Sequence, residues 1–150
     1  MKSIFDTVTR DTFLQRVDQL DTHSKPQWGE MNVCEMMAHC SLAFEYNNGQ
    51  REAKVNPILR FLLKPMMRKV ILGEEPYKKN SPTASYFKVF NTETLELEKQ
   101  RLKQNIINFS NGGAVAAMSR RHVWLGTLTG EEWSWLMYKH LDHHLTQFGV

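Results

Sequence analysis

Two histidines four residues apart near the C-terminus, His140 and His144, are the residues best placed to do chemistry in this chain. Residues 138 to 148 have a sequence typical of a helix, and side chains four apart lie on one face of a helix. Two imidazoles in that arrangement can bind one metal ion. The stripe that contains them begins with Trp133 and Leu136, so we expect both histidines to point into the protein interior.

A metal site needs a third ligand, and His39 is the best candidate. It stands in the middle of another predicted helix, between Met36 and Ala43 on an apolar stripe, where it would face the histidine pair. His23 is expected in solvent at a helix end, and His122 in a loop as a surface or capping residue. Three imidazoles with an open fourth position form an established catalytic zinc site, and imidazole also suits nickel, iron and copper.

Other interpretations of these residues stay open. A histidine on an apolar face is often a hydrogen-bonded core residue that binds no metal. Asp142 and His143 lie on the neighbouring face, as supports of the site or as solvated groups, and His143 is the candidate catalytic base. Gln147 either supports the site or only ends the helix. Cys40 follows His39 directly, points about 100° away around the helix, and should not be a ligand.

Length and composition set further bounds. A chain of 150 residues is expected to form one domain, residues 1 to 150, with a substantial core. Its net charge of +3 is too small to indicate a nucleic-acid binder, and no apolar run reaches the roughly 18–20 residues of a membrane span. The N-terminus lacks the apolar core of a signal peptide. Cys34 and Cys40 lie about 9 Å apart along one predicted helix, too far for a disulfide, which favours a cytoplasmic location.

The chain is predicted to be all-α. Four long helices are expected, over residues 7 to 22, 32 to 47, 92 to 110 and 129 to 148. Capping-box pairs, Asn32 with Glu35 and Thr129 with Glu132, mark two of the starts, and two successive glycines after residue 110 should end the third helix. Helices of this kind form a four-helix bundle, in which the long connection after the second helix allows neighbours to run parallel.

Residues 50 to 90 form a partly helical insert between the second and third long helices. Pro57 should start a short helix and Pro65 should end it, with a further turn over residues 66 to 72. Residues 56 to 72 are apolar and basic, so they could lie on a membrane surface or on a partner; a lid over the bundle and a homodimer contact are the plainer alternatives. We expect the Leu and Ile side chains to pack against the bundle or a second subunit, because so much apolar surface is rarely left in water.

Several short motifs carry a resemblance to a known family. They are Met36-Met37-Ala38-His39-Cys40, His140-Leu141-Asp142-His143-His144-Leu145-Thr146-Gln147, Trp28-Gly29-Glu30-Met31 and Gln147-Phe148-Gly149. Over nearly its whole length the chain resembles the DinB/YfiT-like superfamily of metal-dependent enzymes, and the last two motifs are similar to those of one bacterial group within it. The resemblance implies a four-helix bundle with a metal held by His39, His140 and His144. The insert over residues 59 to 82 distinguishes this chain from the smaller members of the superfamily.

The same resemblance implies thiol-dependent chemistry on a small-molecule substrate: transfer of a low-molecular-weight thiol to an electrophile, or an isomerisation or hydrolysis. The ion would be divalent, with zinc or nickel as the leading candidates and iron after them. It would bind a thiol as thiolate or deprotonate water. Two rival hypotheses remain. One is a non-catalytic binding module that uses residues 56 to 72, and the other is a metal-free bundle.

Overall fold

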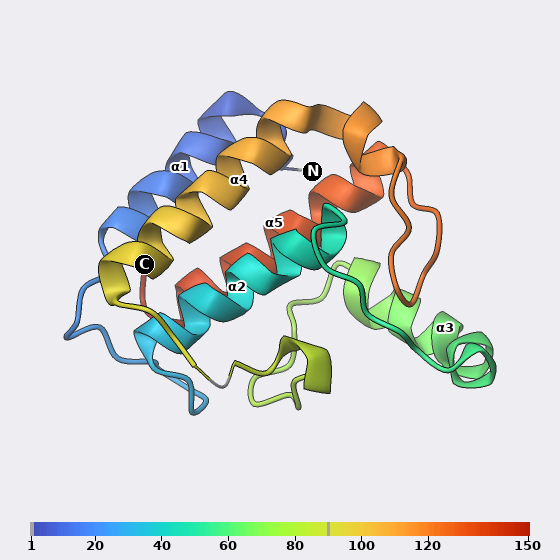
Figure 1. Cartoon of the computed structure of the whole chain (residues 1–150), viewed down its shortest axis with the longest axis horizontal. Coiled ribbons are helices and arrows are strands. Elements are labelled where there is room, and N and C mark those ends of the chain that lie inside the picture. The colour runs from blue at the N-terminus through green and yellow to red at the C-terminus, as the bar shows by residue number, and fades with distance from the viewer. Residues whose placement is uncertain (1, 90) are drawn as a thin grey trace.

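The structure is a computed structural model that describes residues 2 to 89 and 91 to 150. Within these residues the regular elements are all helical, which confirms the prediction of an all-α fold. The long helices and one short 3₁₀ turn follow one another along the chain (Figure 1) as α1 (Thr7–Asp18), α2 (Val33–Asn47), α3 (Pro57–Leu72), η1 (Ser85–Phe87), α4 (Leu95–Met118) and α5 (Gly130–Gln147).

Helices α1, α2, α4 and α5 pack around one apolar core (Figure 1). Helix α4 contacts the other three, and α5 also contacts α1 and α2. Each of the four contributes a large buried side chain: Phe13, Phe44, Ile106 and Trp133. Burying one such side chain stabilises the folded state by about 2–3 kcal/mol. The core therefore fixes α2 and α5, the helices predicted to carry the metal ligands, against each other.

Both of these helices begin at the predicted capping boxes. In α2, Asn32 Oδ1 accepts from the Glu35 N–H at 3.0 Å, and Glu35 Oε2 accepts from the Asn32 N–H at 2.8 Å. In α5, Thr129 Oγ1 accepts from the Glu132 N–H at 3.2 Å, and Glu132 Oε2 accepts from the Thr129 N–H at 2.9 Å. Each pair satisfies two N–H groups that a helix start leaves unpaired, so the first residue of each helix is well determined.

Helix α1 ends at Asp18, four residues before the predicted end. The residues that follow form their own polar turn. Asp21 Oδ1 accepts from the His23 N–H at 2.8 Å and from Ser24 Oγ at 3.1 Å. Short polar side chains that bond the nearby backbone compete with helix continuation, so the apolar pattern that runs on to Leu20 does not extend the helix.

The prediction that Pro65 ends a helix is wrong. Helix α3 runs without a break from Pro57 to Leu72. A proline inside a helix has no N–H to give to the carbonyl four residues back, here that of Phe61. Phe61 is exposed, so water can satisfy that carbonyl group, and the helix continues past the proline.

The two glycines predicted to end the third long helix interrupt it instead. Helix α4 continues to Met118, with a break at Gly113, where φ is 67° and ψ is −174°. This positive φ favours glycine, which has no Cβ to clash with the backbone. The segment after the break is helical and buries Ala117.

Two further findings concern the cysteines and the membrane. Cys34 and Cys40 are both free, as their spacing predicted. Cys40 is fully buried, with its Sγ 3.8 Å from Met36 Sδ, and burial raises the pKa of its thiol. Across the described residues, no helix combines the length and the apolar character needed to pass through a bilayer.

His122 is buried, which corrects its expected place on the surface, although it does cap a turn. Its Nδ1 accepts from the backbone N–H groups of Trp124 at 3.3 Å and Leu125 at 3.2 Å. Burial, together with the nearby charge of Arg60, lowers the pKa of His122 to about 4. The folded protein therefore holds this imidazole neutral where the unfolded chain would protonate it.

This difference predicts a loss of stability in acid. Between the two pKa values, roughly pH 6.5 and pH 4, the unfolded chain binds the extra proton, so the free energy of unfolding falls as the pH falls. From about pH 7.5 to about pH 5, we expect the wild type to lose about 2 kcal/mol more than His122→Asn, whose amide oxygen accepts the same bonds without titrating. Urea unfolding at both pH values measures the free energy of unfolding of each protein. Equal losses in the wild type and in His122→Asn would contradict the lowered pKa of His122.

Candidate metal centre

The three histidines singled out from the sequence come together inside the protein. His39 comes from the middle of α2, and His140 and His144 come from α5. One possible ligand atom from each lies within 4.8 Å of the other two. The ring centroid of His144 is 4.7 Å from that of His39 and 4.8 Å from that of His140. This cluster could hold a metal ion.

Two hydrogen bonds fix which ring nitrogens are free. His39 Nδ1 lies 3.1 Å from the carbonyl oxygen of Phe87, and His144 Nδ1 lies 2.9 Å from Gln147 Oε1. Both oxygens can only accept, so both Nδ1 atoms carry the proton and both Nε2 atoms keep a lone pair that can bind an ion. Such partners orient the ligating histidines in many metal sites.

The third histidine completes the set at close range. His140 Nε2 lies 3.1 Å from His39 Nε2. At this distance the two rings share a hydrogen bond. Two nitrogens that bind one tetrahedral zinc ion at about 2.0–2.1 Å lie about 3.3–3.4 Å apart, so a small outward shift of one ring would let both nitrogens bind the same ion. His140 Nδ1 is buried and has no hydrogen-bond partner among the described residues. Three converging imidazoles thus form a donor set that fits a divalent cation, with His140 the least supported of the three.

Burial keeps these imidazoles neutral. It lowers the pKa of His39 and of His140, where the neighbouring His144 adds to the effect, and it lowers the pKa of His144 to about 3. A metal ion binds the neutral form of histidine, and protons compete with it only when the imidazole is readily protonated. At neutral pH the cluster therefore presents lone pairs rather than charged N–H groups.

The segment before α2 holds the end of α5 that carries His144. Gln147 Nε2 donates to the Trp28 carbonyl oxygen at 2.6 Å, and the Gln27 N–H donates to the Gln147 carbonyl oxygen at 2.7 Å. Gly29 has a φ of 82°, and a Cβ at this position would lie 2.6 Å from Gln147 Nε2. Two separate reasons therefore favour glycine at this position: the positive φ, and the lack of room for a Cβ. Gln147 supports the cluster and does more than end the helix.

His143 lies beside the cluster and is half-buried. Its ring centroid is 5.7 Å from that of Trp28, 5.6 Å from that of Tyr77 and 5.0 Å from that of His144. Burial lowers the pKa of His143, so the neutral form dominates at neutral pH. A neutral imidazole next to the cluster and still within reach of water has the position and the charge state of a proton acceptor.

The other polar candidates lie elsewhere. His23 is exposed in the turn after α1, and His122 lies with its ring centroid 5.9 Å from that of Trp133. Asp142 forms an ion pair of 2.6 Å with Arg16 of α1, so it serves the packing of α1 on α5. These three residues take no part in the cluster.

Sequence reasoning missed the residues that cover the cluster from the insert. The Phe87 ring lies 5.7 Å from that of His39 and 6.5 Å from that of His140, and the Tyr77 ring lies 6.4 Å from that of His140. A backbone carbonyl such as that of Phe87 leaves no mark in a sequence. The aromatic residues within the otherwise polar residues 74 to 88 were the available signal.

Replacing the supporting amide should weaken metal binding without removing a ligand. We expect Gln147→Leu to raise the dissociation constant for zinc about 10- to 100-fold, because His144 Nδ1–H loses its acceptor and the ring loses its orientation. Competition with a chromogenic chelator measures this change. Gln104→Leu, at an exposed glutamine of α4, is the matched control. An unchanged dissociation constant would show that the bond to Gln147 does not orient a ligand.

The fold and the site together define an all-helical protein with a three-histidine cluster that could hold a metal ion. In a comparison with protein-family models, residues 5–149 match the family described as protein of unknown function (DUF1569). The match covers nearly the whole chain, so the chain belongs to this family. No curated protein and no solved structure gives a match.

Proposed function

We propose that this protein is a metal-dependent enzyme in which His39, His140 and His144 hold a divalent ion and leave one position open for a ligand. The observation that carries the proposal is the pair of bonds from His39 to Phe87 and from His144 to Gln147, which leave both Nε2 atoms available to an ion in a cluster whose possible ligand atoms lie within 4.8 Å of one another. A structural zinc site usually has four protein ligands, often including cysteine. Cys40 packs against Met36 instead, which supports an open site.

The proposal extends to the fold. The packing of α1, α2, α4 and α5, with α3 and η1 between the second and third of them, supports the four-helix bundle of the DinB/YfiT-like superfamily that the motifs resemble. On that basis we propose thiol-dependent transferase or hydrolase chemistry on a small molecule, with zinc or nickel as the ion and iron next. When bound, the ion lowers the pKa of a thiol or of water, so that a nucleophile exists at neutral pH.

The chain's own residues would manage the proton and the surroundings. A ring nitrogen of His143 would accept the proton that the thiol or water loses, and its half-exposed position lets that proton pass on to solvent. Trp28, Tyr77 and Phe87 would form apolar walls that exclude bulk water from the cluster.

The direct test is the metal content of the protein purified without an affinity tag, followed by activity assays with that metal restored. We expect about one divalent ion per chain and a metal-dependent transfer of a small thiol to an electrophile, or metal-dependent hydrolysis. His143→Gln should lower the turnover number by about 100-fold or more while metal content is unchanged. A chain that binds no divalent ion at micromolar concentration would refute the proposal.

A thermal melt of the metal-stripped protein separates a catalytic ion from a structural one. The core is built from Phe, Ile, Leu and Trp side chains of four helices, so the stripped protein should remain folded. Small structural zinc domains unfold outright when the metal is removed. The same outcome here would make the ion a structural support and remove the main argument for an enzyme.

A further inference from the structure

No side chain of α3 is buried, and its outward face is apolar. Ile58, Phe61 and Leu62 are 71%, 81% and 64% exposed, and Leu59, Met66 and Val70 are exposed as well. The partly buried residues of α3 are Arg60, Leu63, Met67 and Ile71, which form a narrow inward stripe at helical spacing, and Leu72 at the end of the helix. The Leu and Ile side chains of α3 were expected to pack against the bundle or a second subunit. Within a single chain, only the partly buried ones do so.

Helix α3 is held firmly with that face turned outward. Among the helices it contacts only α5, and Figure 1 shows it to one side of the other long helices. Lys139 Nζ donates to the carbonyl oxygens of Val70 at 2.9 Å and Gly73 at 2.8 Å, and Arg68 pairs with Glu132 of α5. The apolar face is thus a fixed surface of the molecule rather than a loose segment.

The charged residues of α3 itself are all of one sign. Residues 57 to 72 include four basic residues and no acidic one. The Nη2 atoms of Arg60 and Arg121 lie 2.9 Å and 3.7 Å from the place that a Cβ on Gly126 would occupy, so two guanidinium groups gather there. In the described part of the chain, neither of them forms an ion pair, and nor do the exposed Lys64 and Lys69.

This charge decides between the possible occupants. A second copy of α3 would bring the basic residues of the two helices together, and neither copy of α3 has an acidic residue of its own to offset them, which disfavours self-association. An anionic lipid surface suits both features, because apolar side chains enter the interface while Lys and Arg meet lipid phosphates. We propose that α3, with Arg121 of the turn that follows α4, docks this protein on anionic membranes. The proposal does not depend on the metal site.

Co-sedimentation of the full-length chain with lipid vesicles tests it. We expect binding to vesicles of phosphatidylcholine with about one-third phosphatidylglycerol, much weaker binding to phosphatidylcholine alone, and a loss of binding as salt is raised. A basic residue at the surface contributes about fivefold in binding, so Lys64→Glu with Lys69→Glu should weaken it at least about tenfold. Ile58→Ser with Phe61→Ser should weaken it by a similar factor.

The matched control is Val8→Ser with Val115→Ser, because these valines are 74% and 79% exposed on α1 and α4, away from α3. This control should bind like the wild type, and circular dichroism checks that every variant is folded. The proposal is overturned if anionic vesicles bind no protein, or if the control loses as much binding as the α3 variants. It is also overturned if light scattering finds a dimer that Ile58→Ser with Phe61→Ser dissociates, since the face would then join two copies.

Discussion

Replacing His144 by alanine should weaken zinc binding more than 100-fold and leave the protein folded. The change removes one of three converging nitrogens, and even the loss of an orienting partner costs about 10- to 100-fold in metal affinity. Competition with a chromogenic chelator gives the dissociation constant, and circular dichroism follows the fold. His23→Ala, at an exposed histidine in the turn after α1, is the matched control and should bind zinc like the wild type.

Two outcomes of that experiment would contradict the site. If His144→Ala binds zinc as tightly as the wild type, the cluster is not where the ion binds. If the variant unfolds even without metal, the imidazole serves mainly to hold Gln147 and, through it, the Trp28 carbonyl. The same pair of measurements on His39→Ala distinguishes a general loss of packing from the loss of a ligand.

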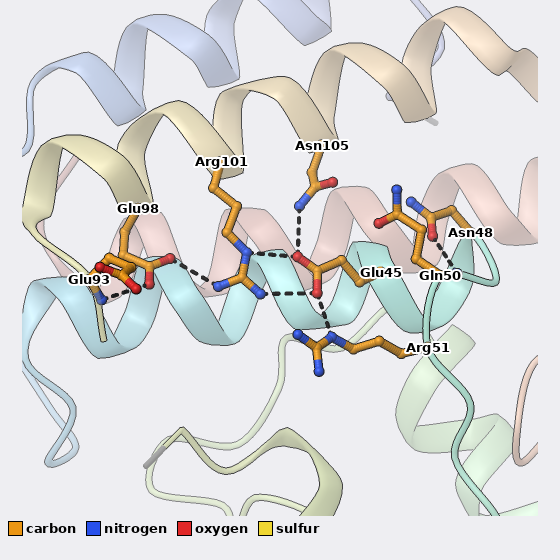
Figure 2. Close-up of polar contacts among 8 residues, drawn as sticks. All are labelled: Glu45, Asn48, Gln50, Arg51, Glu93, Glu98, Arg101 and Asn105. Atoms are coloured by element: carbon orange, nitrogen blue, oxygen red, sulfur yellow. Dashed lines mark hydrogen bonds and ion pairs between the residues drawn. The ribbon is translucent and has the colours of Figure 1, made fainter. Parts of the chain in front are cut away.

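The second large effect concerns a buried carboxylate on the other side of α2. Glu45 accepts from Arg101 at 2.7 Å and 3.0 Å and from Arg51 at 2.6 Å, with Asn105 Nδ2 at 3.5 Å (Figure 2). Arg101 also pairs with Glu98 at 3.2 Å. Burial alone would raise the pKa of Glu45, but the two guanidinium groups outweigh it and hold that pKa below its usual value.

Glu45→Ala should therefore lower the free energy of unfolding by about 3 kcal/mol at neutral pH, because it leaves the partly buried Arg101 short of its main acceptor. Arg51→Ala removes a half-exposed partner and should cost less than about 1 kcal/mol. Urea unfolding measures both. A lowered pKa means that the contribution of Glu45 is present above its unfolded pKa and is lost as the pH falls through the folded one, so the two variants should converge in acid. Equal losses at neutral pH would contradict this ranking.

The parts of the structure that the sequence predicted depend on residue patterns that lie within single helices. The i, i+4 spacing of His140 and His144 and the apolar stripe around His39 were enough to predict that the three would meet, because the core then fixes α2 against α5. The capping boxes were predicted for the same reason, since both partners lie within one turn.

The parts that were missed depend on contacts between distant segments or on competition. Phe87 reaches His39 from 48 residues away through a backbone carbonyl, which no residue type reveals. The polar turn at Asp21 overrides an apolar pattern, and the exposure of Phe61 lets α3 pass a proline. The bond from Gln147 to Trp28 joins two motifs that were each visible, but only the folded chain shows that they touch.

The bond between His39 and Phe87 also has a kinetic consequence. An ion bound to Nε2 would make the Nδ1–H of the same ring a stronger donor, and it would thereby stabilise η1 against local opening. The insert would in turn affect the ion, because Phe87 and Tyr77 of the insert cover the cluster. Where release of an ion requires this cover to open, the residence time of the ion would follow the opening rate of η1 rather than the strength of its bonds to nitrogen. The rate of backbone amide hydrogen exchange in residues 84 to 88 would then match the rate of metal release.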